Sequence, residues 1–178
     1  MGRSCYKIYN PQQPHFLTST IVNWIPIFTR PTTVKILLNS FQYLQKQYQL
    51  RLYGFVVLEN HLHWLAQSEN LPKEISRFKS YTAKMIIRHL EEQRQYKLLL
   101  RQLSFYKKKH KKDRQYQLWE EGSHPQEMQN KIMMRQKLDY IHQNPVKRGY
   151  VNDPCHWRYS SACNYHREVG LIEVMTHW

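Results

Sequence analysis

The sequence has little cysteine and no long apolar run. Its three cysteines, Cys5, Cys155 and Cys163, form no CxxC pair, and an odd count at these spacings fits a reducing compartment better than a disulfide-bonded secreted scaffold. No apolar run is long enough to span a bilayer, and the first residues contain no signal-peptide core. We therefore expect a cytoplasmic protein with no membrane partner.

Acidic residues are also scarce. Asp and Glu number 13 against 27 Lys and Arg, which gives a formal net charge of +14. Such an excess attracts polyanions, and nucleic acid is favoured because basic side chains release the counterions condensed on phosphates. A soluble basic protein without a nucleic-acid partner, or one that touches acidic membranes, would carry the same charge. The charge alone therefore does not identify the partner, and the pattern of residues along the chain has to distinguish these three classes of protein.

Internal repeats and linkers rich in Pro, Ser or Gly are absent as well. A chain of 178 residues with 41% hydrophobic residues is sufficient for one core, so we expect a single domain over residues 1–178. Alternating apolar positions and β-branched residues predict three strands and a short fourth strand. The predicted strands are 15–23, 52–58, 61–67 and 118–123, with a tight turn at residues 59–60.

Apolar residues at helical spacing predict three helices. They cover residues 31–48, 72–94 and 129–143. A proline begins each of the first two, and Pro145 is expected to end the third because the residue before a proline resists the α conformation. Helices interleaved with strands, one pair of which forms a hairpin, predict an α+β sandwich with a mainly antiparallel sheet.

Basic side chains concentrate in three places. On the second helix they recur at helical spacing opposite the apolar stripe, which describes either a solvated face or a ridge that follows phosphates. Residues 95–117 are expected to form a basic loop, whose centre at 106–114 is too charged to pack. An aromatic tail at 147–178 begins with two more cations. The candidate DNA-binding residues are Lys73, Arg77, Lys84, Arg88, Lys107, Lys108, Lys109, Lys111, Lys112, Lys147 and Arg148.

Two histidines, His61 and His63, lie two residues apart on a predicted strand. Because strand side chains alternate between faces, both imidazoles project the same way, while Leu62, Trp64 and Ala66 point into a core. Two neutral imidazoles side by side suit a divalent cation. Taken alone, this pair is better explained by surface histidines that pair by chance.

The third helix carries a polar stripe turned away from its core residues. Tyr140 and Asn144 lie one turn apart on this stripe. Tyrosine can act as a covalent nucleophile, and an Asn carbonyl oxygen is a suitable hard ligand for Mg²⁺ or Mn²⁺. A tyrosine at the edge of the core or an asparagine near a helix end needs no functional explanation by itself. For both of these residues and the two histidines to lack a function, however, several independent coincidences would be required.

The sequence resembles a known family at these residues. ENHLHWL at 59–65 looks like the His-hydrophobe-His (HUH) motif of single-strand DNA nucleases, and LDYIHQNPVKRGYV at 138–151 resembles the tyrosine helix of REP-associated tyrosine transposases. FKSYTA at 78–83 and HWRYSSACNY at 156–165 are also similar to that family's pattern. The resemblance spans nearly the whole chain and implies a ferredoxin-like sandwich of the HUH nuclease type.

The resemblance also implies roles for four residues. His61 and His63 match the histidine ligands of a divalent cation, Asn144 matches the third ligand, and Tyr140 matches the nucleophile. The implied partner is single-stranded or hairpin DNA formed by repetitive extragenic palindromes, which would place the protein at the nucleoid as a monomer or homodimer. Cleavage would give a 5′-phosphotyrosine and a free 3′-hydroxyl. One departure is Glu59, where many relatives have proline.

Other interpretations of the sequence stay open. A protein of the same fold could hold hairpins without cutting them, and a basic RNA-binding protein could hold a structural metal, although no cysteine ligands lie near the histidines. Tyr81 is a rival nucleophile, but position 85 holds methionine rather than a ligand. Unpaired bases are expected to stack on tail aromatics such as Trp157 and Tyr159. The adjacent Cys155 and His156 do not by themselves indicate a cysteine hydrolase.

Overall fold

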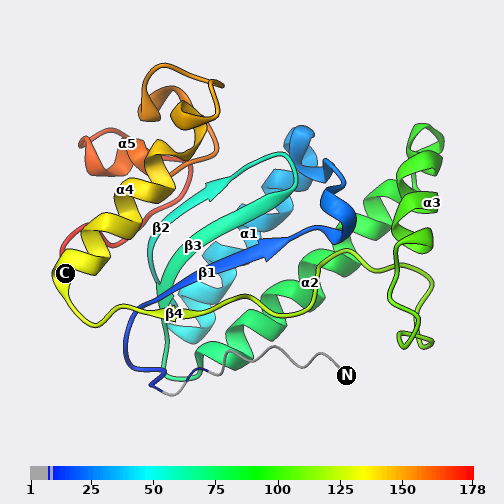
Figure 1. Cartoon of the computed structure of the whole chain (residues 1–178), viewed down its shortest axis with the longest axis horizontal. Helices are drawn as coiled ribbons and strands as arrows, with labels where there is room; N and C mark the ends of the chain where they lie inside the picture. Colours follow the sequence, from blue (N-terminus) through cyan, green and yellow to red (C-terminus); the bar gives the residue numbers. More distant parts are fainter. Residues whose placement is uncertain (1–7, 9) are drawn as a thin grey trace.

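The computed structural model describes residue 8 and residues 10–178, so Cys5 lies outside the described residues. Its centre is a four-stranded antiparallel sheet in the order β2-β3-β1-β4. The strands are β1 (His15–Thr20), β2 (Arg51–Val57), β3 (His61–Gln67) and β4 (Gln126–Glu127). With one helix between β1 and β2 and another after β3, this is a ferredoxin-like arrangement (Figure 1). The predicted α+β sandwich with an antiparallel sheet is confirmed.

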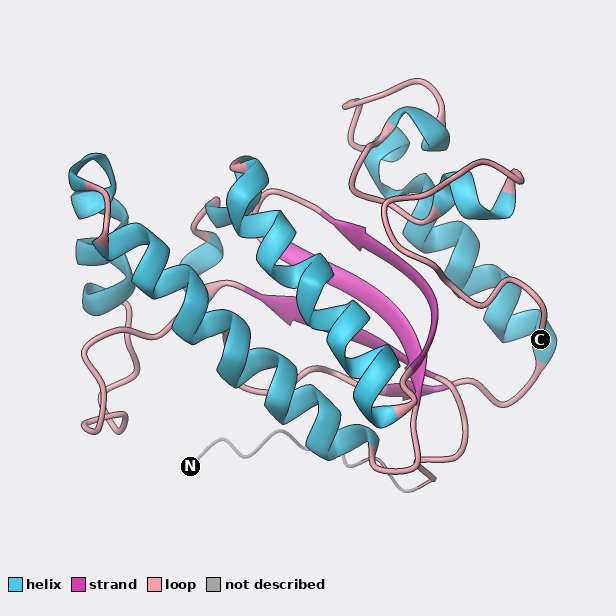
Figure 2. Cartoon of the chain, turned by 180° about the vertical axis from the view of Figure 1, so that it is seen from behind, coloured by secondary structure: helices cyan, strands magenta, loops and turns pink. Residues whose placement is uncertain are grey.

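The two faces of the sheet pack against different helices. Helices α1 (Pro31–Tyr48) and α2 (Leu71–Glu91) cover one face, as Figure 2 shows from behind. Leu62, Trp64 and Ala66 of β3 point into this larger core, and Trp64 is fully buried, as predicted. Leu65 points to the opposite face and packs with apolar residues of α4 (Lys131–Lys147). His61 and His63 share the face of Leu65, because strand side chains alternate.

Helix α4 lies unusually close to β2. Gly54 makes this possible, because a Cβ atom there would stand 2.6 Å from Cδ2 of Leu138. The helix begins after Asn130, whose side chain accepts a hydrogen bond from the backbone N–H of Met133 at 2.9 Å. Leu138 then packs among the buried residues that join α4 to the sheet. A small residue on β2 therefore brings the polar stripe of α4 near the histidine strand.

The prediction that Pro145 ends this helix was wrong. Pro145 is buried inside α4, which continues to Lys147. The carbonyls of Asn144 and Val146 accept backbone hydrogen bonds from Arg148 and Gly149, so the turn after the proline is closed without its missing N–H. Gly149, with φ of 73°, then turns the chain away from the helix. The predicted start at residue 129 was two residues early.

Other boundaries and elements also differ from the sequence prediction. The first strand ends at Thr20, before a 3-10 turn at Val22–Trp24, and α2 ends at Glu91. Part of the predicted basic loop is helix α3 (Lys97–Phe105), which follows a 3-10 turn at Arg94–Tyr96. Residues 118–123 do run beside β1, but positive φ angles at Gly122 and His124 break the ladder, so the fourth strand forms later.

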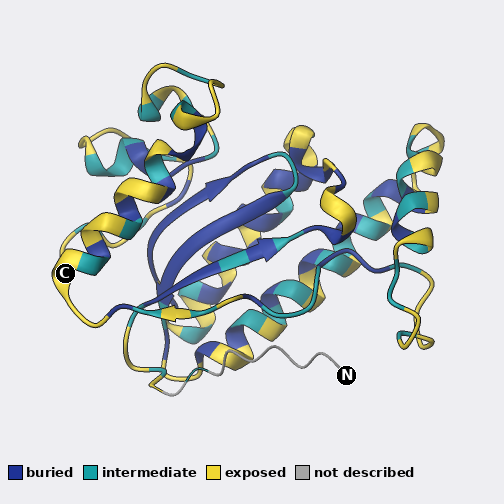
Figure 3. Ribbon diagram, viewed as in Figure 1, coloured by how far each residue is buried: buried dark blue, intermediate teal, exposed yellow. Residues whose placement is uncertain are grey.

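The aromatic tail is ordered against the edge of β2. The carbonyl of Tyr159 accepts the backbone N–H of Val57 at 2.8 Å, and Ser160 forms a β-bridge with Val56. Two short helical turns, η4 (Pro154–His156) and α5 (Ala162–Tyr165), complete this segment, and a 3-10 turn at Ile27–Thr29 precedes α1. Figure 3 shows β2 and β3 almost wholly buried, β1 largely buried, and the short edge strand β4 more exposed. Within the described residues, no helix combines the length and apolar character that crossing a membrane requires.

Candidate active site

His61 and His63 form the centre of the site. Both are buried, with 3% and 6% of their surface exposed, and their ring centroids lie 4.8 Å apart. His61 Nδ1 lies 2.7 Å from the side-chain oxygen of Asn60, and His63 Nδ1 lies 2.9 Å from the hydroxyl of Thr18. An Nδ1 proton donated to each oxygen leaves the Nε2 lone pair of each ring available as a ligand.

Tyr140 of α4 faces this pair. Its hydroxyl oxygen lies 3.5 Å from Nε2 of His63, and the two rings meet edge to face with centroids 5.3 Å apart. Phe16 contacts both rings, stacking on His63 and meeting Tyr140 at its edge. Tyr140 is 40% exposed, so its ring is held from one side and reachable from the other. The structure therefore brings the phenol and the histidines together within one chain.

Asn144 joins the site through Arg148. The Nε of Arg148 donates to the side-chain oxygen of Asn144 at 3.0 Å, and its Nη1 pairs with Glu59 at 3.2 Å. Among the described residues, no hydrogen bond or ring contact links Asn144 directly to either histidine. Arg148 thus ties the end of α4 to the turn before β3, and Glu59, the departure from the family pattern, has a partner in this chain.

The electrostatics of the pair favour metal ligation. Burial, with the nearby charge of Arg148, lowers the pKa of His61 to about 4, and burial, with the neighbouring His61, lowers the pKa of His63 to about 3. Both rings are therefore neutral at neutral pH, which is the form that binds metals. No group of three or more His, Cys, Asp or Glu residues in the described part of the chain could hold a metal. A third protein ligand here would have to be an amide such as Asn144.

Besides Phe16, Thr18 and Asn60, two further residues at the site were not singled out from the sequence. The ammonium of Lys137 lies 4.7 Å from the centroid of the Phe16 ring and 5.7 Å from that of Tyr140. Its position three residues before Tyr140 on the same helix would have indicated this contact. Trp24 meets His61 edge to face at 5.5 Å. No sequence pattern signals it, because residues around it were assigned to the first strand.

The predicted cations of α2 lie away from the histidines. Helix α2 covers the other face of the sheet (Figures 1 and 2). Arg77 pairs with Glu74 at 2.6 Å and lies over the ring of Tyr48, and Arg88 pairs with Glu92 at 3.0 Å. Lys73 and Lys84 are exposed. Of the predicted DNA-binding residues, Arg148 is the one in contact with the site, and Lys147 precedes it.

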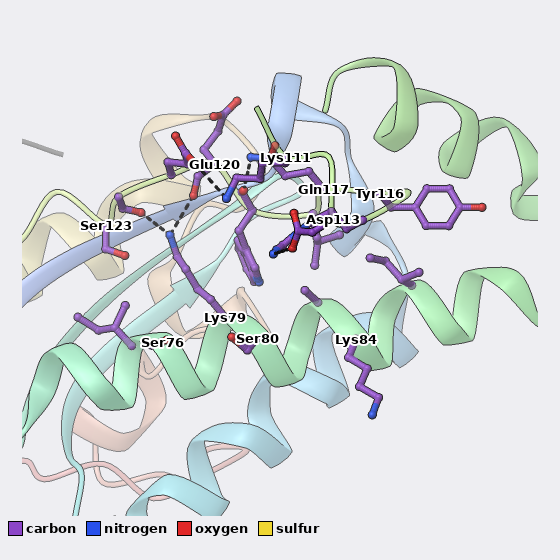
Figure 4. Close-up of a pocket in the computed structure, with 18 of the residues that line it drawn as sticks. Ser76, Lys79, Ser80, Lys84, Lys111, Asp113, Tyr116, Gln117, Glu120 and Ser123 are labelled. Atoms are coloured by element: carbon purple, nitrogen blue, oxygen red, sulfur yellow. Dashed lines mark hydrogen bonds and ion pairs between the residues drawn. The ribbon is translucent and has the colours of Figure 1, made fainter. Parts of the chain in front are cut away.

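A separate cavity of about 1700 Å³ lies between α2 and residues 110–125 (Figure 4), and Lys111 is the one of the predicted loop lysines that lines it. Much of their charge is matched there, because Glu121 pairs with Lys108 and Lys111, while Glu120 also pairs with Lys108. Lys107 donates to the carbonyl of Lys111. The two remaining predicted cations of this loop, Lys109 and Lys112, are exposed. Figure 4 also shows Lys79 bonded to the backbone of this segment.

The other nucleophiles and the base-stacking aromatics considered from the sequence do not contact His61, His63 or Tyr140. Tyr81 is half exposed on α2, on the face opposite Tyr140. The indole N–H of Trp157 donates to the carbonyl of Val57 at 3.0 Å, and its ring stacks on Tyr150, so this aromatic already has a structural role. Tyr159 packs against the larger core. Burial and the neighbouring Cys163 raise the pKa of Cys155 to about 11, which is the opposite of an activated thiol.

Comparisons with known proteins support the fold. No protein-family model matches the chain, and no curated protein sequence matches it significantly. Among solved structures, the chain is similar to a REP-associated tyrosine transposase bound to a REP hairpin, with a TM-score of 0.65 and 17% identity, covering 91% of this chain and 82% of that chain. The resemblance inferred from the sequence is confirmed at the level of the fold: this chain has the fold of a REP-associated tyrosine transposase.

Proposed function

We propose that the protein is a metal-dependent single-strand DNA endonuclease and strand transferase, which cleaves at or near palindromic hairpins through a 5′-phosphotyrosine intermediate. The observation that carries this proposal is the hydroxyl of Tyr140, 3.5 Å from Nε2 of His63, whose ring centroid lies 4.8 Å from that of His61. A nucleophile beside two neutral imidazoles, each of which can offer an Nε2 lone pair to a cation, suits metal-assisted phosphodiester cleavage.

The bond changes are simple. The Tyr140 oxygen attacks the phosphorus and loses its proton to solvent or a nearby base, the new P–O bond forms, and the bond from phosphorus to the 3′-oxygen breaks. That oxygen takes a proton and leaves as a 3′-hydroxyl. Because the phosphotyrosine ester keeps the bond energy, the 3′-hydroxyl of another strand can reverse the reaction and join the ends. Lys137, near the Tyr140 ring, and Arg148 would stabilise negative charge on the phosphate.

A divalent cation, Mg²⁺ or Mn²⁺, fits the donor set. His61 and His63 would hold it through Nε2, because their Nδ1 atoms already have oxygen partners. Asn144 is the candidate third ligand, and its oxygen would have to exchange Arg148 for the metal. When bound, the cation would supply charge stabilisation at a non-bridging phosphate oxygen. Asn60 and Thr18 would orient the two rings.

Hairpin DNA is the substrate that the observations favour. The structural neighbour is described as bound to a REP hairpin. The net charge of +14 suits a polyanion, and a single active tyrosine can cut one strand, which favours single-stranded or hairpin substrates over duplexes. Recognition of such palindromes would place this chain at the nucleoid.

The test is a covalent adduct. A labelled strand that contains a palindrome is incubated with the protein and Mn²⁺, and the products are separated under denaturing conditions. We expect a protein–DNA adduct that requires the cation. Tight hairpin binding without an adduct under any divalent cation would instead identify a non-catalytic hairpin-binding regulator. Stoichiometric zinc that resists chelation, with preference for RNA, would favour a basic RNA-binding protein with a structural metal.

A further inference from the structure

Trp24 has a backbone conformation that its side chain disfavours. Both Asn23 and Trp24 lie in the left-handed region, with φ of 51° and 55°. Such strain in a bulky residue persists where the surrounding structure enforces it, and it gathers at functional sites. Here the enforcing contacts are backbone hydrogen bonds from Trp24 N–H to the carbonyl of Ile21 and from Ile21 N–H to the carbonyl of Asn60. The strained turn is thus fastened to the start of β3.

Packing does not explain the tryptophan. Its neighbours Val22 and Ile25 are buried, with 0% and 3% exposure, whereas Trp24 itself is 59% exposed. The other four tryptophans of the chain are buried or half-buried. Trp24 meets His61 in a T-shaped contact with an interplanar angle of 69°, so the two rings are not stacked face to face. A large exposed aromatic ring is therefore held beside the candidate metal-binding histidine at a conformational cost.

We propose that Trp24 is a stacking platform for one unpaired base of the DNA strand next to the phosphate that Tyr140 attacks. Stacking on aromatic rings is the common way in which proteins hold unpaired bases, because every base has a π face. Paired bases inside a duplex stem have both faces covered by their neighbours and cannot use such a platform. This inference rests on the proposed function and assigns one residue, Trp24, to the single-stranded part of that substrate.

The first experiment uses tryptophan fluorescence. The probes are one hairpin with a single-stranded thymine tail and the same hairpin with a blunt end, each added to Tyr140→Phe protein so that no cleavage occurs. We expect additional quenching with the tailed hairpin, and we expect this tail-dependent part to vanish in the Trp24→Leu, Tyr140→Phe protein. Tail-dependent quenching that persists without Trp24 would overturn the proposal. Because this readout needs no cleavage, it is independent of the adduct that tests the proposed function.

The second experiment uses affinity and stability together. Trp24→Gly should weaken binding of the tailed hairpin by about 5- to 150-fold, the range for one lost stacked base, and should leave blunt-hairpin affinity unchanged. Glycine accepts a positive φ, so the same variant should melt at the same temperature or higher. Trp24→Phe should keep most of the affinity, and Tyr43→Ala, which removes an exposed aromatic of α1, should change neither measurement. Unfolding of Trp24→Gly, or unchanged tail affinity, would show that Trp24 does not hold a base.

Discussion

Two polar clusters in this chain hold ionisable groups whose pKa values are lowered by burial, yet their chemistry differs. The histidine cluster consists of His61, His63 and Tyr140, and the lysine cluster consists of Lys79 with the backbone of residues 120–122. Burial lowers the pKa of the two histidines to about 4 and about 3, and it lowers the pKa of Lys79 to about 8. A shifted pKa alone would therefore mark both clusters as candidate sites.

The difference lies in which atoms remain unsatisfied. The ammonium of Lys79 donates to the carbonyls of Glu120 and Gly122, and carboxylates of the same segment match the neighbouring charges. In the histidine cluster each ring has a partner on Nδ1, while Nε2 faces a nucleophile or a possible ligand position. Spare lone pairs beside a nucleophile indicate chemistry, whereas a satisfied buried cation indicates structure. The predictions below test this contrast.

The largest effect is expected at the nucleophile. Tyr140→Phe removes the attacking oxygen, so adduct formation should fall by at least about 10⁴-fold while hairpin affinity is kept. Tyr81→Phe, on the opposite face, is the matched control and should form adduct at the normal rate. Adduct yield on denaturing gels and hairpin affinity by filter binding measure the two quantities. Loss of the adduct in the Tyr81 variant instead would reassign the nucleophile.

Removing the basic group of each cluster should affect the cleavage rate very differently. His63→Ala should lower the cleavage rate by about 10²- to 10³-fold, because the charge stabilisation that depends on this ligand is lost. Lys79→Met should leave the cleavage rate within about twofold, since Lys79 contacts neither the histidines nor Tyr140. Single-turnover cleavage at saturating Mn²⁺ compares them. Similar losses in both variants would mean that the lysine cluster belongs to the active site.

Smaller effects should come from the oxygen atoms that orient the rings. Asn60→Ala and Thr18→Val each remove the partner of one Nδ1, so the apparent Mn²⁺ affinity should fall by about 10- to 100-fold while the rate at saturating metal changes less. Titration of cleavage against Mn²⁺ concentration gives both numbers. Thr32→Val, at an exposed position of α1, serves as the control. An unchanged metal affinity in both variants would show that the Nε2 atoms do not ligate the metal.

The sequence was informative wherever local chemistry determines the structure. Proline at the start and a regular apolar stripe define α1 with the predicted bounds, and strand alternation correctly assigns Trp64 to the core and the histidines to the other face. It was less informative where distant contacts decide. Pro145 is buried within α4, which continues past it to Lys147, and the salt bridge between Arg148 and Glu59 joins residues 89 positions apart.

The contrast between local and distant contacts also explains how much of the candidate site could be predicted from the sequence. Tyr140 could be predicted to share a face with Asn144, since helical spacing is local, but its approach to His63 depends on the absence of a side chain at Gly54. The role of Arg148 as partner of the Asn144 oxygen was not predictable either, because cations near a helix end were assigned to phosphate binding. Trp24 escaped notice because its left-handed backbone interrupts a run of strand-forming residues.

The smallest expected effect concerns the stability of the lysine cluster. Because burial holds the pKa of Lys79 at about 8, below the ordinary value of 10.5, the unfolded chain binds more protons than the folded chain between these pH values. Stability from this group therefore rises as pH increases through that window. Lys79→Met should lose this rise, so its stability relative to the unmodified chain should fall by about 2 kcal/mol between pH 8 and pH 10. Denaturant unfolding of both proteins at each pH measures the difference, and Lys84→Met, at an exposed site of the same helix, should show no such trend. If the free energy of unfolding of the Lys79 variant changed with pH in the same way as that of the unmodified chain, Lys79 would be fully solvated. The two clusters would then differ simply because one is buried and the other is not.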